Sequence, residues 1–517
     1  MPAPPTGRGP VTLDGAGWQD SNAAGSEREN QDDSLLPESS LYGWLAALLV
    51  VGFIGLQILV ACLVLLRPHR RQSSSLAWLI VLLLLPGLGL LGWFLFGEVR
   101  VGRSRVARHR RIQDEVRRAL ITPFATCKGV TLDETFRSLA ELGHTVCETD
   151  PRPGNQVDLF ANTGQAVQRL IDDIDGAADH VHLLFYIWLP DDTGKRVAEA
   201  VLRATERGVA CRILVDALGS RSFLESSLPG ALREAGAQVV AALEPPFLPL
   251  LTARVDLRNH RKIAVIDHDI GYTGSQNLAD AAFAPKAKYA PWVDTMLRLE
   301  GPAVADLQEL FIEDWYLDTN ESLADLLRIP APREDGIPVQ VMGTGPNSVN
   351  DALVQILQAS IHLAREEVIL TTPYFVPDEG TLSALSTAAR RGVEVTLVVP
   401  HKNDSFLVAA ASRSFYEPLL TAGVKVLEYT AGLLHAKTMT VDRQLAYVGS
   451  ANLDRRSFEI NFEISTMLYD SDFASHLRLL QRTYMDSTIA IHPERWMQRR
   501  WYNRVGQNAA GLLGPLL

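Results

Sequence analysis

The sequence has few cysteines for its length, and their spacing suits neither disulfides nor metal binding. Its 517 residues include four, Cys62, Cys127, Cys147 and Cys211, with no C-x-x-C pair among them. We therefore expect reduced thiols rather than a disulfide framework or a cysteine-based zinc site. The chain also lacks an excess of basic residues, because its formal net charge is −11. This balance argues against nucleic acid as the main partner, since phosphate-backbone binding requires a basic surface.

The N-terminal region lacks the layout of a signal peptide, because no basic start leads into an apolar core. Residues 1–40 carry seven acidic residues against two arginines and predict a solvated, disordered tail. Charged residues are then absent from two long runs, 42–66 and 76–96. At 1.5 Å per residue, runs of about 20 residues or more can cross a hydrocarbon core of roughly 30 Å. We predict membrane segments rather than buried core helices, because core helices rarely lack a polar stripe over this length.

The arginines around these runs give two possible orientations. Three lie in the short loop between the runs and six follow the second run, whereas the N-terminal flank is acidic. The positive-inside rule places both groups in the cytoplasm, which two full crossings do not allow. Either the larger group decides and the tail also lies inside, or the Pro86-Gly87-Leu88-Gly89 kink lets the second segment re-enter and the tail lies outside. Both arrangements put the C-terminal body in the cytoplasm, beside anionic lipid.

One pattern of residues occurs twice. Asn259-His260-Arg261-Lys262 precedes Asp267 and Gly274-Ser275-Gln276-Asn277, and the second copy is His435-Ala436-Lys437, Asp442 and Gly449-Ser450-Ala451-Asn452. In both copies the Asp lies five residues past the Lys and the Gly lies fourteen past the His. A single His-x-Lys arises by chance in many proteins, but this agreement of spacings does not. The apolar residues between Lys and Asp predict a buried strand whose alternation places His and Lys on one face.

The segments before each motif repeat as well. A strand-like run at 181–188 or 368–375 is followed by a Pro-Asp turn, a helical pattern, Arg-Gly-Val and a second strand-like run at 211–215 or 395–399. This internal duplication predicts an α/β fold. We expect two similar lobes about a pseudo-twofold axis, preceded by two membrane helices, with the two His-x-Lys strands face to face.

The duplicated motif resembles the HKD signature of the phospholipase D superfamily. Other features resemble those of bacterial cardiolipin synthases. They are the two apolar segments, the Asp191-Asp192-x-Gly194 turn, the run Phe458-Glu459-Ile460-Asn461-Phe462-Glu463 and the closing Leu-Leu-Gly-Pro-Leu-Leu. The likeness covers nearly everything after about residue 41. It implies that one phosphatidylglycerol donates its phosphatidyl group to the enzyme, releasing glycerol, and that a second attacks to give cardiolipin.

Cleavage of a phosphodiester needs a nucleophile at phosphorus, stabilisation of charge on the phosphoryl oxygens, and a proton for the leaving oxygen. Two motifs supply these without a metal or another cofactor, since one imidazole forms a phosphohistidine while the other protonates the leaving oxygen. The resemblance implies that His260 is the nucleophile and His435 the acid and base. Lys262 and Lys437 contribute positive charge beside the phosphate.

The remaining candidate residues support this pair of histidines. The hydrogen-bond donors expected around the phosphoryl oxygens are Ser275, Asn277, Ser450 and Asn452. The resemblance implies that an acidic residue after Gly-Ser-x-Asn orients each nucleophilic ring, and the candidates are Asp294 and Glu463. The motif aspartates, Asp267 and Asp442, end their strands, and we interpret them as structural anchors.

Other residues allow more than one interpretation. Asp267-His268-Asp269 has the composition of a metal site, but its position after a strand favours a solvated turn. His180 and His182 are interpreted as packing or surface groups. The stretch from Arg495 to Arg504 mixes arginine with Trp496 and Trp501, which suits either a solvated helix or a membrane interface.

These inferences divide the chain into five regions: an acidic tail (1–40), a two-segment membrane anchor (41–97), a basic linker and connecting region (98–150), a first lobe (151–335), and a second lobe with the basic aromatic segment (336–517). We expect a multi-pass protein of the cell membrane with its lobes in the cytoplasm, acting on phosphatidylglycerol beside other anionic lipids. The alternative enzyme is a membrane-bound phospholipase D that hydrolyses or exchanges headgroups. A tethered nuclease is disfavoured by the charge, and an inactive lipid-binding scaffold is disfavoured by two intact motifs.

Overall fold

The computed structural model describes residues 38–66, 72–97, 102–120, 132–244, 254, 256–349 and 351–512. Several predicted features lie outside these residues: the acidic tail up to residue 37, the loop arginines Arg67, Arg70 and Arg71, the thiol of Cys127, and the last five residues. Helix α1 up to Leu63 forms one unit and the chain from Val64 onward forms another, so the two are described separately.

The two apolar runs form different structures. The first is a single helix, α1 (Glu38–Leu66), whose stretch Tyr42–Leu66 has the length and composition of a membrane span. The second is divided at Leu85 into α2 (Gln72–Leu84) and α3 (Pro86–Phe96). Proline is favoured at the start of a helix and disrupts its interior, because it has no N–H to donate. Among the described residues, one helix rather than the expected two is long enough to span a membrane.

Helices α2 and α3 fold back on one another as an antiparallel hairpin. Gly89 of α3 lies against the backbone of Val81 and Leu82, and Gly92 lies beside the ring of Trp78. A Cβ atom at Gly89 would come within 2.7 Å of the Val81 carbonyl oxygen, so this contact requires glycine. The 13 and 11 residues of these helices are each too short to cross roughly 30 Å of hydrocarbon at 1.5 Å per residue.

A long mixed sheet forms the centre of the second unit. Its strands before residue 336 are β1 (Arg152–Phe160), β2 (His180–Phe185), β3 (Ala210–Asp216), β4 (Gln238–Ala242), β6 (Lys262–Ile266), β7 (Ile270–Gly274) and β9 (Met296–Glu300). Those after it are β10 (Ile337–Thr344), β11 (Glu367–Thr371), β13 (Glu394–Pro400), β14 (Lys425–Tyr429), β16 (Thr438–Val441), β17 (Leu445–Gly449), β19 (Asn461–Leu468) and β20 (Thr488–Ala490). We call these two sets of residues, 151–335 and 336–517, the first half and the second half.

The strand order is the same when each half is followed outward from the middle of the sheet. The first half runs β1-β9-β7-β6-β2-β3-β4, and the second runs β10-β19-β17-β16-β11-β13-β14, followed by an additional edge strand, β20. The two halves join where β1 pairs antiparallel with β10. Each motif strand, β6 or β16, lies between two antiparallel neighbours in equivalent positions. The predicted mixed α/β fold is confirmed.

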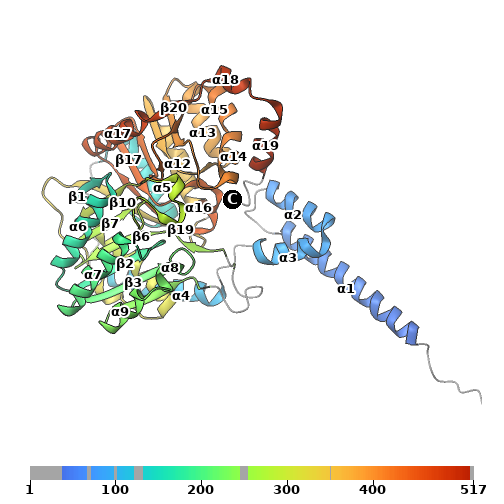
Figure 1. Cartoon of the computed structure of the whole chain (residues 1–517), viewed down its shortest axis with the longest axis horizontal. Helices are drawn as coiled ribbons and strands as arrows, with labels where there is room; N and C mark the ends of the chain where they lie inside the picture. Colours follow the sequence, from blue (N-terminus) through green and yellow to red (C-terminus); the bar gives the residue numbers. More distant parts are fainter. Residues whose placement is uncertain are drawn as a thin grey trace, which may run out of the picture. The chain divides into compact units, whose positions relative to one another are not determined.

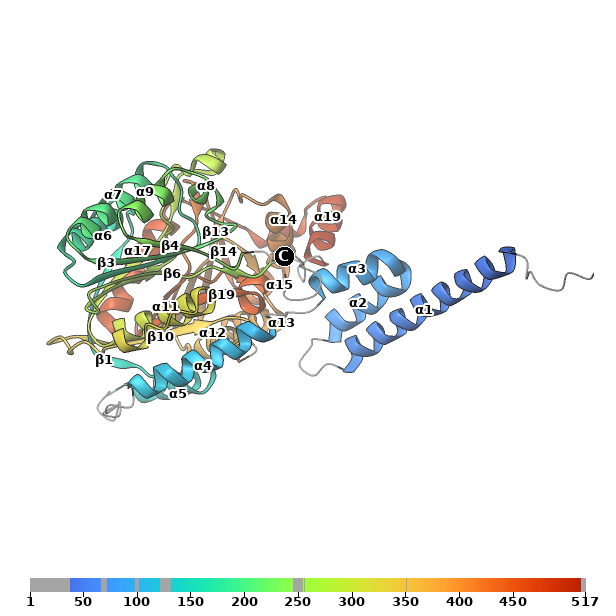
Figure 2. The same ribbon diagram turned by 90° about the horizontal axis from the view of Figure 1, so that it is seen from below.

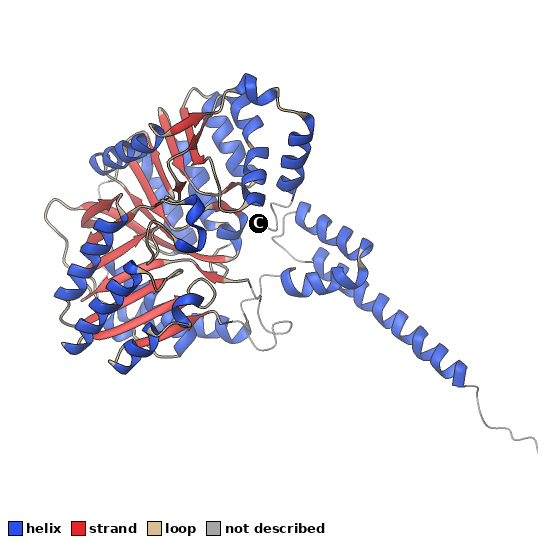
Figure 3. Cartoon of the chain, in the orientation of Figure 1, coloured by secondary structure: helices blue, strands red, loops and turns tan. Residues whose placement is uncertain are grey.

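Helices cover both faces of the sheet, as Figures 2 and 3 show, and the two halves lie side by side in Figure 1. The outer helices of the first half are α6 (Thr163–Gly176), α7 (Asp192–Glu206) and α9 (Leu228–Glu234), and those of the second are α12 (Ala352–Leu363), α13 (Glu379–Arg390) and α15 (Tyr416–Ala422). On the other face lie α11 (Val304–Thr319) and α17 (Ser471–Met485), which share one apolar core with strands of both halves. Burial of this shared core stabilises the arrangement of the halves.

Most of the region expected to be a basic linker is helical and packed. Helix α4 (Arg103–Leu120) lies on α11 and buries Ile112 and Val116 completely, while Arg105 pairs with Asp318 at 2.6 Å. Helix α5 (Glu134–Cys147) packs against α12 and β10. The four-residue spacing of Ile112 and Val116 among arginines is the sequence signal for an amphipathic helix at α4.

The C-terminal basic aromatic stretch forms α18 (Pro493–Met497) and α19 (Trp501–Leu512). Trp496 packs against Tyr416 with ring centres 5.1 Å apart, and the guanidinium of Arg499 stacks on Trp496 at 3.9 Å. Trp501, in contrast, is 74% exposed. Helix α19 packs against α14 (Phe406–Ser414), so both parts of the stretch are joined to the second half, while Trp501 presents its side chain to the surroundings.

Candidate active site

Both motif histidines lie where a short strand of one half pairs with a strand of the other. Strand β5 (Arg258–Asn259) pairs with the start of β19, and β15 (Leu433–Leu434) pairs with β8 (Trp292–Val293). The backbone N–H of His260 donates to the Phe462 carbonyl at 2.9 Å, and that of His435 donates to the Val293 carbonyl at 2.8 Å. Each half therefore fixes the backbone of the histidine that belongs to the other half.

The orienting carboxylates are exchanged in the same way. Nδ1 of His260 lies 2.8 Å from Oε2 of Glu463, and Nδ1 of His435 lies 2.6 Å from Oδ1 of Asp294. Glu463 belongs to the second half and Asp294 to the first, so each acid contacts the histidine of the opposite half. A hydrogen bond at Nδ1 fixes the ring and leaves Nε2 as the nitrogen that faces a substrate.

The two motif serines contact these carboxylates. The Ser275 hydroxyl donates to Asp294 at 2.6 Å, and the Ser450 hydroxyl donates to Glu463. Each serine oxygen also accepts a backbone N–H, from Thr295 at 2.9 Å or from Ile464 at 3.0 Å. The hydroxyl protons thus point to carboxylates, which differs from the expectation that both serines donate to phosphate.

Asn461 is a further contact of Glu463 that the sequence pattern alone did not single out. Its amide Nδ2 donates to Oε1 of Glu463 at 3.1 Å, so the two carboxylate oxygens have separate partners. The signal was present in the sequence, because residues two apart on a strand share a face. Asn277 accepts the Ile187 backbone N–H at 3.1 Å through its side-chain oxygen, which leaves its amide N–H groups as donors.

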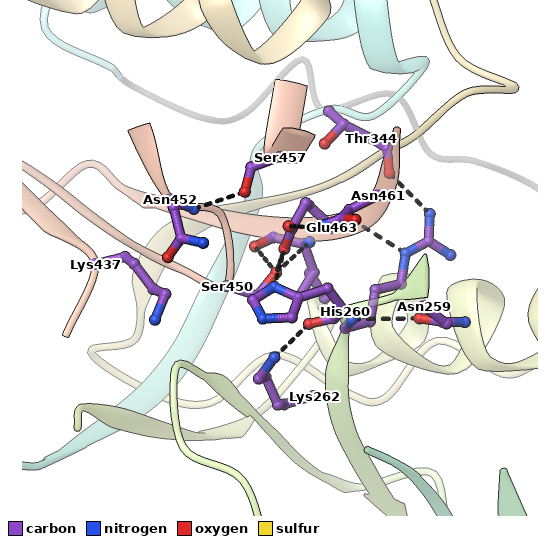
Figure 4. A network of polar contacts seen from close by, with 12 residues as sticks. Asn259, His260, Lys262, Thr344, Lys437, Ser450, Asn452, Ser457, Asn461 and Glu463 are labelled. Carbon is purple, nitrogen blue, oxygen red and sulfur yellow. Dashed lines mark hydrogen bonds and ion pairs between the residues drawn. The ribbon is translucent and has the colours of Figure 1, made fainter. Parts of the chain in front are cut away.

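The motif lysines are almost completely buried, with Lys262 at 0% and Lys437 at 1% exposure. Each ammonium donates to the backbone carbonyl of the histidine in its own motif, at 2.5 Å for Lys262 and 2.6 Å for Lys437. Figure 4 shows both lysines on the side of the His260 ring that carries its free nitrogen. Burial lowers the pKa of Lys262 to about 7 and that of Lys437 to about 8. Each lysine also disfavours protonation of the histidine in the other motif.

His260 and its carboxylate partner from the second half, Glu463, have complementary protonation states. Burial lowers the pKa of His260 to about 4, although Glu463 opposes this shift. Burial alone would raise the pKa of Glu463, but the charges of His260 and Lys262 outweigh it and lower the pKa to about 2. Near neutral pH the ring is therefore neutral and the carboxylate ionised. His435 and Asp294 also have lowered pKa values, with burial as the main cause for His435.

The motif aspartates lie away from the histidine rings and hold backbone. Asp267 accepts the N–H groups of residues 178, 179 and 180 at 2.7, 2.8 and 2.9 Å. Asp442 accepts those of residues 365, 366 and 367, all at 2.8 Å. Both aspartates have positive φ, 51° in each case, and both end the motif strand. These contacts tie the end of the motif strand to the start of the neighbouring strand.

One aromatic ring packs beside each histidine. Tyr186 lies edge-on to His260 with ring centres 4.7 Å apart, and Trp292 lies 4.6 Å from His435. Tyr186 follows β2 directly, and Trp292 begins β8. Both rings restrict the motion of the imidazoles and lower the local dielectric.

Comparison with known proteins gives consistent results along the chain. The family described as "Cardiolipin synthase, PLD-like domain" matches residues 170–315 and 357–480, which contain the two motifs, and the family described as "Phospholipase_D-nuclease N-terminal" matches residues 56–98. Cardiolipin synthase A of Edwardsiella ictaluri (strain 93-146) is 36% identical over 490 residues, covering 93% of this chain and 100% of the relative. Cardiolipin synthase A of Yersinia pseudotuberculosis serotype O:1b is also 36% identical, over 87% of this chain and 94% of the relative.

A solved structure shares the fold. The crystal structure of phosphatidylserine synthase from Haemophilus influenzae Rd KW20 covers 74% of this chain and 100% of its own, with a TM-score of 0.56 and 15% sequence identity. The identity and coverage of the sequence relatives, together with the match of both halves to one family, establish the relationship. The chain belongs to the cardiolipin synthase family of the phospholipase D superfamily.

Proposed function

We propose that this chain is a cardiolipin synthase that moves a phosphatidyl group from one phosphatidylglycerol to another through a phosphohistidine. The central observation is the exchange of carboxylates between the halves, which presents two oriented imidazoles around a shared pair of buried lysines. Lys437 lowers the pKa of His260 and Lys262 lowers the pKa of His435, which supports one site shared by the two motifs.

In the first step, Nε2 of His260 attacks phosphorus while the bond from phosphorus to the glycerol headgroup oxygen breaks. His435 donates a proton to that oxygen, and glycerol leaves. Lys262 and Lys437 stabilise the charge that develops on the phosphoryl oxygens. The bound phosphodiester is itself negative, and its charge favours the protonated form of His435 that this step requires.

In the second step, His435 removes the proton from a free hydroxyl of a second phosphatidylglycerol. The resulting oxygen attacks phosphorus, the bond to His260 breaks, and cardiolipin is released. The carboxylates of Glu463 and Asp294 hold the rings in one tautomer through both steps. We assign Ser275 and Ser450 to positioning these carboxylates, and Asn277 and Asn452 to binding the phosphate.

The two halves are proposed to be copies of one unit about a pseudo-twofold axis. The identical strand order outward from β1 and β10 supports this relation, as do the equivalent contacts of Asp267 and Asp442. The axis would pass near the junction of β1 and β10, which places the two motif strands at equal distances from it.

We further propose that α1 crosses the membrane once, that the α2–α3 hairpin re-enters it, and that the catalytic body faces the cytoplasm. The separation of α2 from α3 at Leu85 and their antiparallel packing support re-entry. This arrangement puts both groups of arginines on the cytoplasmic side, as the positive-inside rule favours, and places the acidic tail outside.

Product identity tests the proposal. Purified full-length protein in detergent is given phosphatidylglycerol labelled in its headgroup and acyl chains. Transfer yields cardiolipin and glycerol, whereas hydrolysis by a phospholipase D yields phosphatidic acid and an inactive scaffold yields no product. His260→Ala and His435→Ala are each expected to reduce cardiolipin formation to background. Full activity in either variant would contradict the division of roles between the histidines.

A further inference from the structure

Three histidines gather at the end of β2 that is remote from the motif lysines. The ring centres of His180 and His182 lie 4.3 Å apart, and those of His180 and His268 lie 4.2 Å apart. Within the Asp267-His268-Asp269 turn, Asp269 is exposed, but His268 is only 9% exposed and points inward. In the β2–β6 pair, His180 lies near Asp267 while Phe185 lies opposite Lys262. At about 3.3 Å per residue, this end is some 15 Å from the lysine position.

We propose that Asp179, His180 and His268 form a binding site for a divalent transition-metal ion of the zinc class. Oδ2 of Asp179 lies 3.0 Å from Nδ1 of His180 and 3.2 Å from Nε2 of His268, and all three ligand atoms lie within 4.8 Å of one another. In a tetrahedral zinc site with bonds of about 2.0–2.1 Å, neighbouring ligand atoms are about 3.3 Å apart. Two imidazoles and a carboxylate suit zinc and cobalt(II), with water completing the shell.

The orientation of His268 points to a ligand. Both of its ring nitrogens are buried without a hydrogen bond of good geometry to any residue in the described part of the chain, and Nε2 lies 3.2 Å from the Asp179 carboxylate. A buried polar nitrogen without a partner is costly, and coordination of a metal would satisfy it.

The second half contains the same backbone frame with different side chains. Asp442 holds the N–H groups of residues 365–367 as Asp267 holds those of residues 178–180, and the next residue has positive φ in both turns. There, however, the equivalents of Asp179 and His268 are Glu366 and Arg443, which form an ion pair at 2.7 Å. In the second half the carboxylate is paired with the guanidinium of Arg443, whereas in the first half the Asp179 carboxylate faces two imidazoles. A bound metal would supply the missing charge and fasten β2 to the β6–β7 turn.

Metal titration of the full-length protein tests this inference. The protein is purified in detergent without a histidine tag, stripped with a chelator and titrated with zinc by calorimetry and with cobalt(II) by visible absorption. We expect about one equivalent to bind, with a zinc-dependent rise in the unfolding midpoint. In His268→Ala the affinity should fall more than about tenfold. Failure of the wild type to bind, or equal binding by this variant, would overturn the site.

Two further variants guard against misfolding and against non-specific binding. Asp179→Glu combined with His268→Arg rebuilds the Glu366–Arg443 pair in the first half, and it should fold, lose metal binding and still make cardiolipin. His144→Ala removes an exposed histidine that lies 3.1 Å from Asp150, and it should bind metal as the wild type does. Loss of binding in His144→Ala, or its retention in the double variant, would refute the assignment. Cardiolipin formation in these variants reports on the proposed function independently.

Discussion

At the scale of single residues, the proposed mechanism assigns nucleophilic attack and proton transfer to different histidines. His260 is neutral because burial lowers its pKa, and Glu463 fixes its Nδ1 as the donating nitrogen. His435 has the same surroundings in the other motif, with Asp294 at 2.6 Å. Both imidazoles have an Nδ1–carboxylate contact, so the geometry alone does not tell the nucleophile from the acid. A substrate whose leaving group needs no acid can distinguish the two roles.

A phosphatidyl ester of p-nitrophenol makes that distinction. Its leaving group departs as a stable anion, so His435→Ala should still form the phosphohistidine and release a burst of about one equivalent of p-nitrophenolate, followed by slow turnover. His260→Ala should show no burst, because the nucleophile is missing. Stopped-flow absorbance measures the burst amplitude. The reverse pattern would assign the nucleophile to His435.

The lysines predict a pH dependence. Their pKa values of about 7 and about 8 mean that the free enzyme loses positive charge as the pH rises through this range, whereas His260 stays neutral down to a pH of about 4. Values of kcat/KM for the p-nitrophenyl substrate should therefore fall above about pH 7–8. At saturating substrate the phosphodiester charge raises both lysine pKa values, so the fall in kcat should shift to higher pH. A kcat/KM that stays constant up to pH 10 would contradict this explanation.

At the scale of secondary-structure elements, the division of the second apolar run is the main departure from the sequence pattern. Hydropathy averages over a window and does not register that α2 ends at Leu84 and α3 begins at Pro86. The glycines that allow α3 to pack on α2 lie within the same run. Composition therefore indicated a second span where the chain forms two short helices.

Cysteine labelling tests the orientation of these elements. In a chain whose native cysteines are replaced, Ser39→Cys marks the first turns of α1, and Lys425→Cys marks an exposed strand end in the second half. A membrane-impermeant maleimide applied to intact cells should label Ser39→Cys and leave Lys425→Cys unlabelled until the membrane is opened. Protection of Ser39→Cys in intact cells would favour two full crossings instead.

At the scale of the whole molecule, neither half contains a complete site. The carboxylate partner of His260 lies 203 residues away, and that of His435 lies 141 residues away. The short strands β5 and β15 make the same exchange through the backbone. The continuous sheet and the apolar core shared by α11 and α17 hold the halves in the register that these contacts require.

The exchange predicts that changes in one half impair the chemistry of the other. Glu463→Gln should slow the p-nitrophenolate burst by about 10²- to 10⁴-fold, because the nucleophile in the first half loses its orienting acceptor. Asp294→Asn, the matched change, should leave the burst nearly intact and slow turnover with phosphatidylglycerol. Circular dichroism controls for folding. Equal effects of the two variants on the burst would argue against the exchanged arrangement.

The sequence by itself determined the residue types of the site and the class of the fold. The repeated spacings of His, Lys, Asp and Gly-Ser-x-Asn and the apolar strands between them are local features, and strand periodicity makes local features readable. The candidates Asp294 and Glu463 came from the family resemblance. Only the tertiary structure decided which acid faces which histidine, that the serine hydroxyls point to carboxylates, and that Trp292 packs on His435. The carboxylates reach the histidines from opposite halves, 203 and 141 positions away, so no local pattern specifies these pairs. The serine contacts join residues 19 and 13 positions apart and depend on the fold of one half.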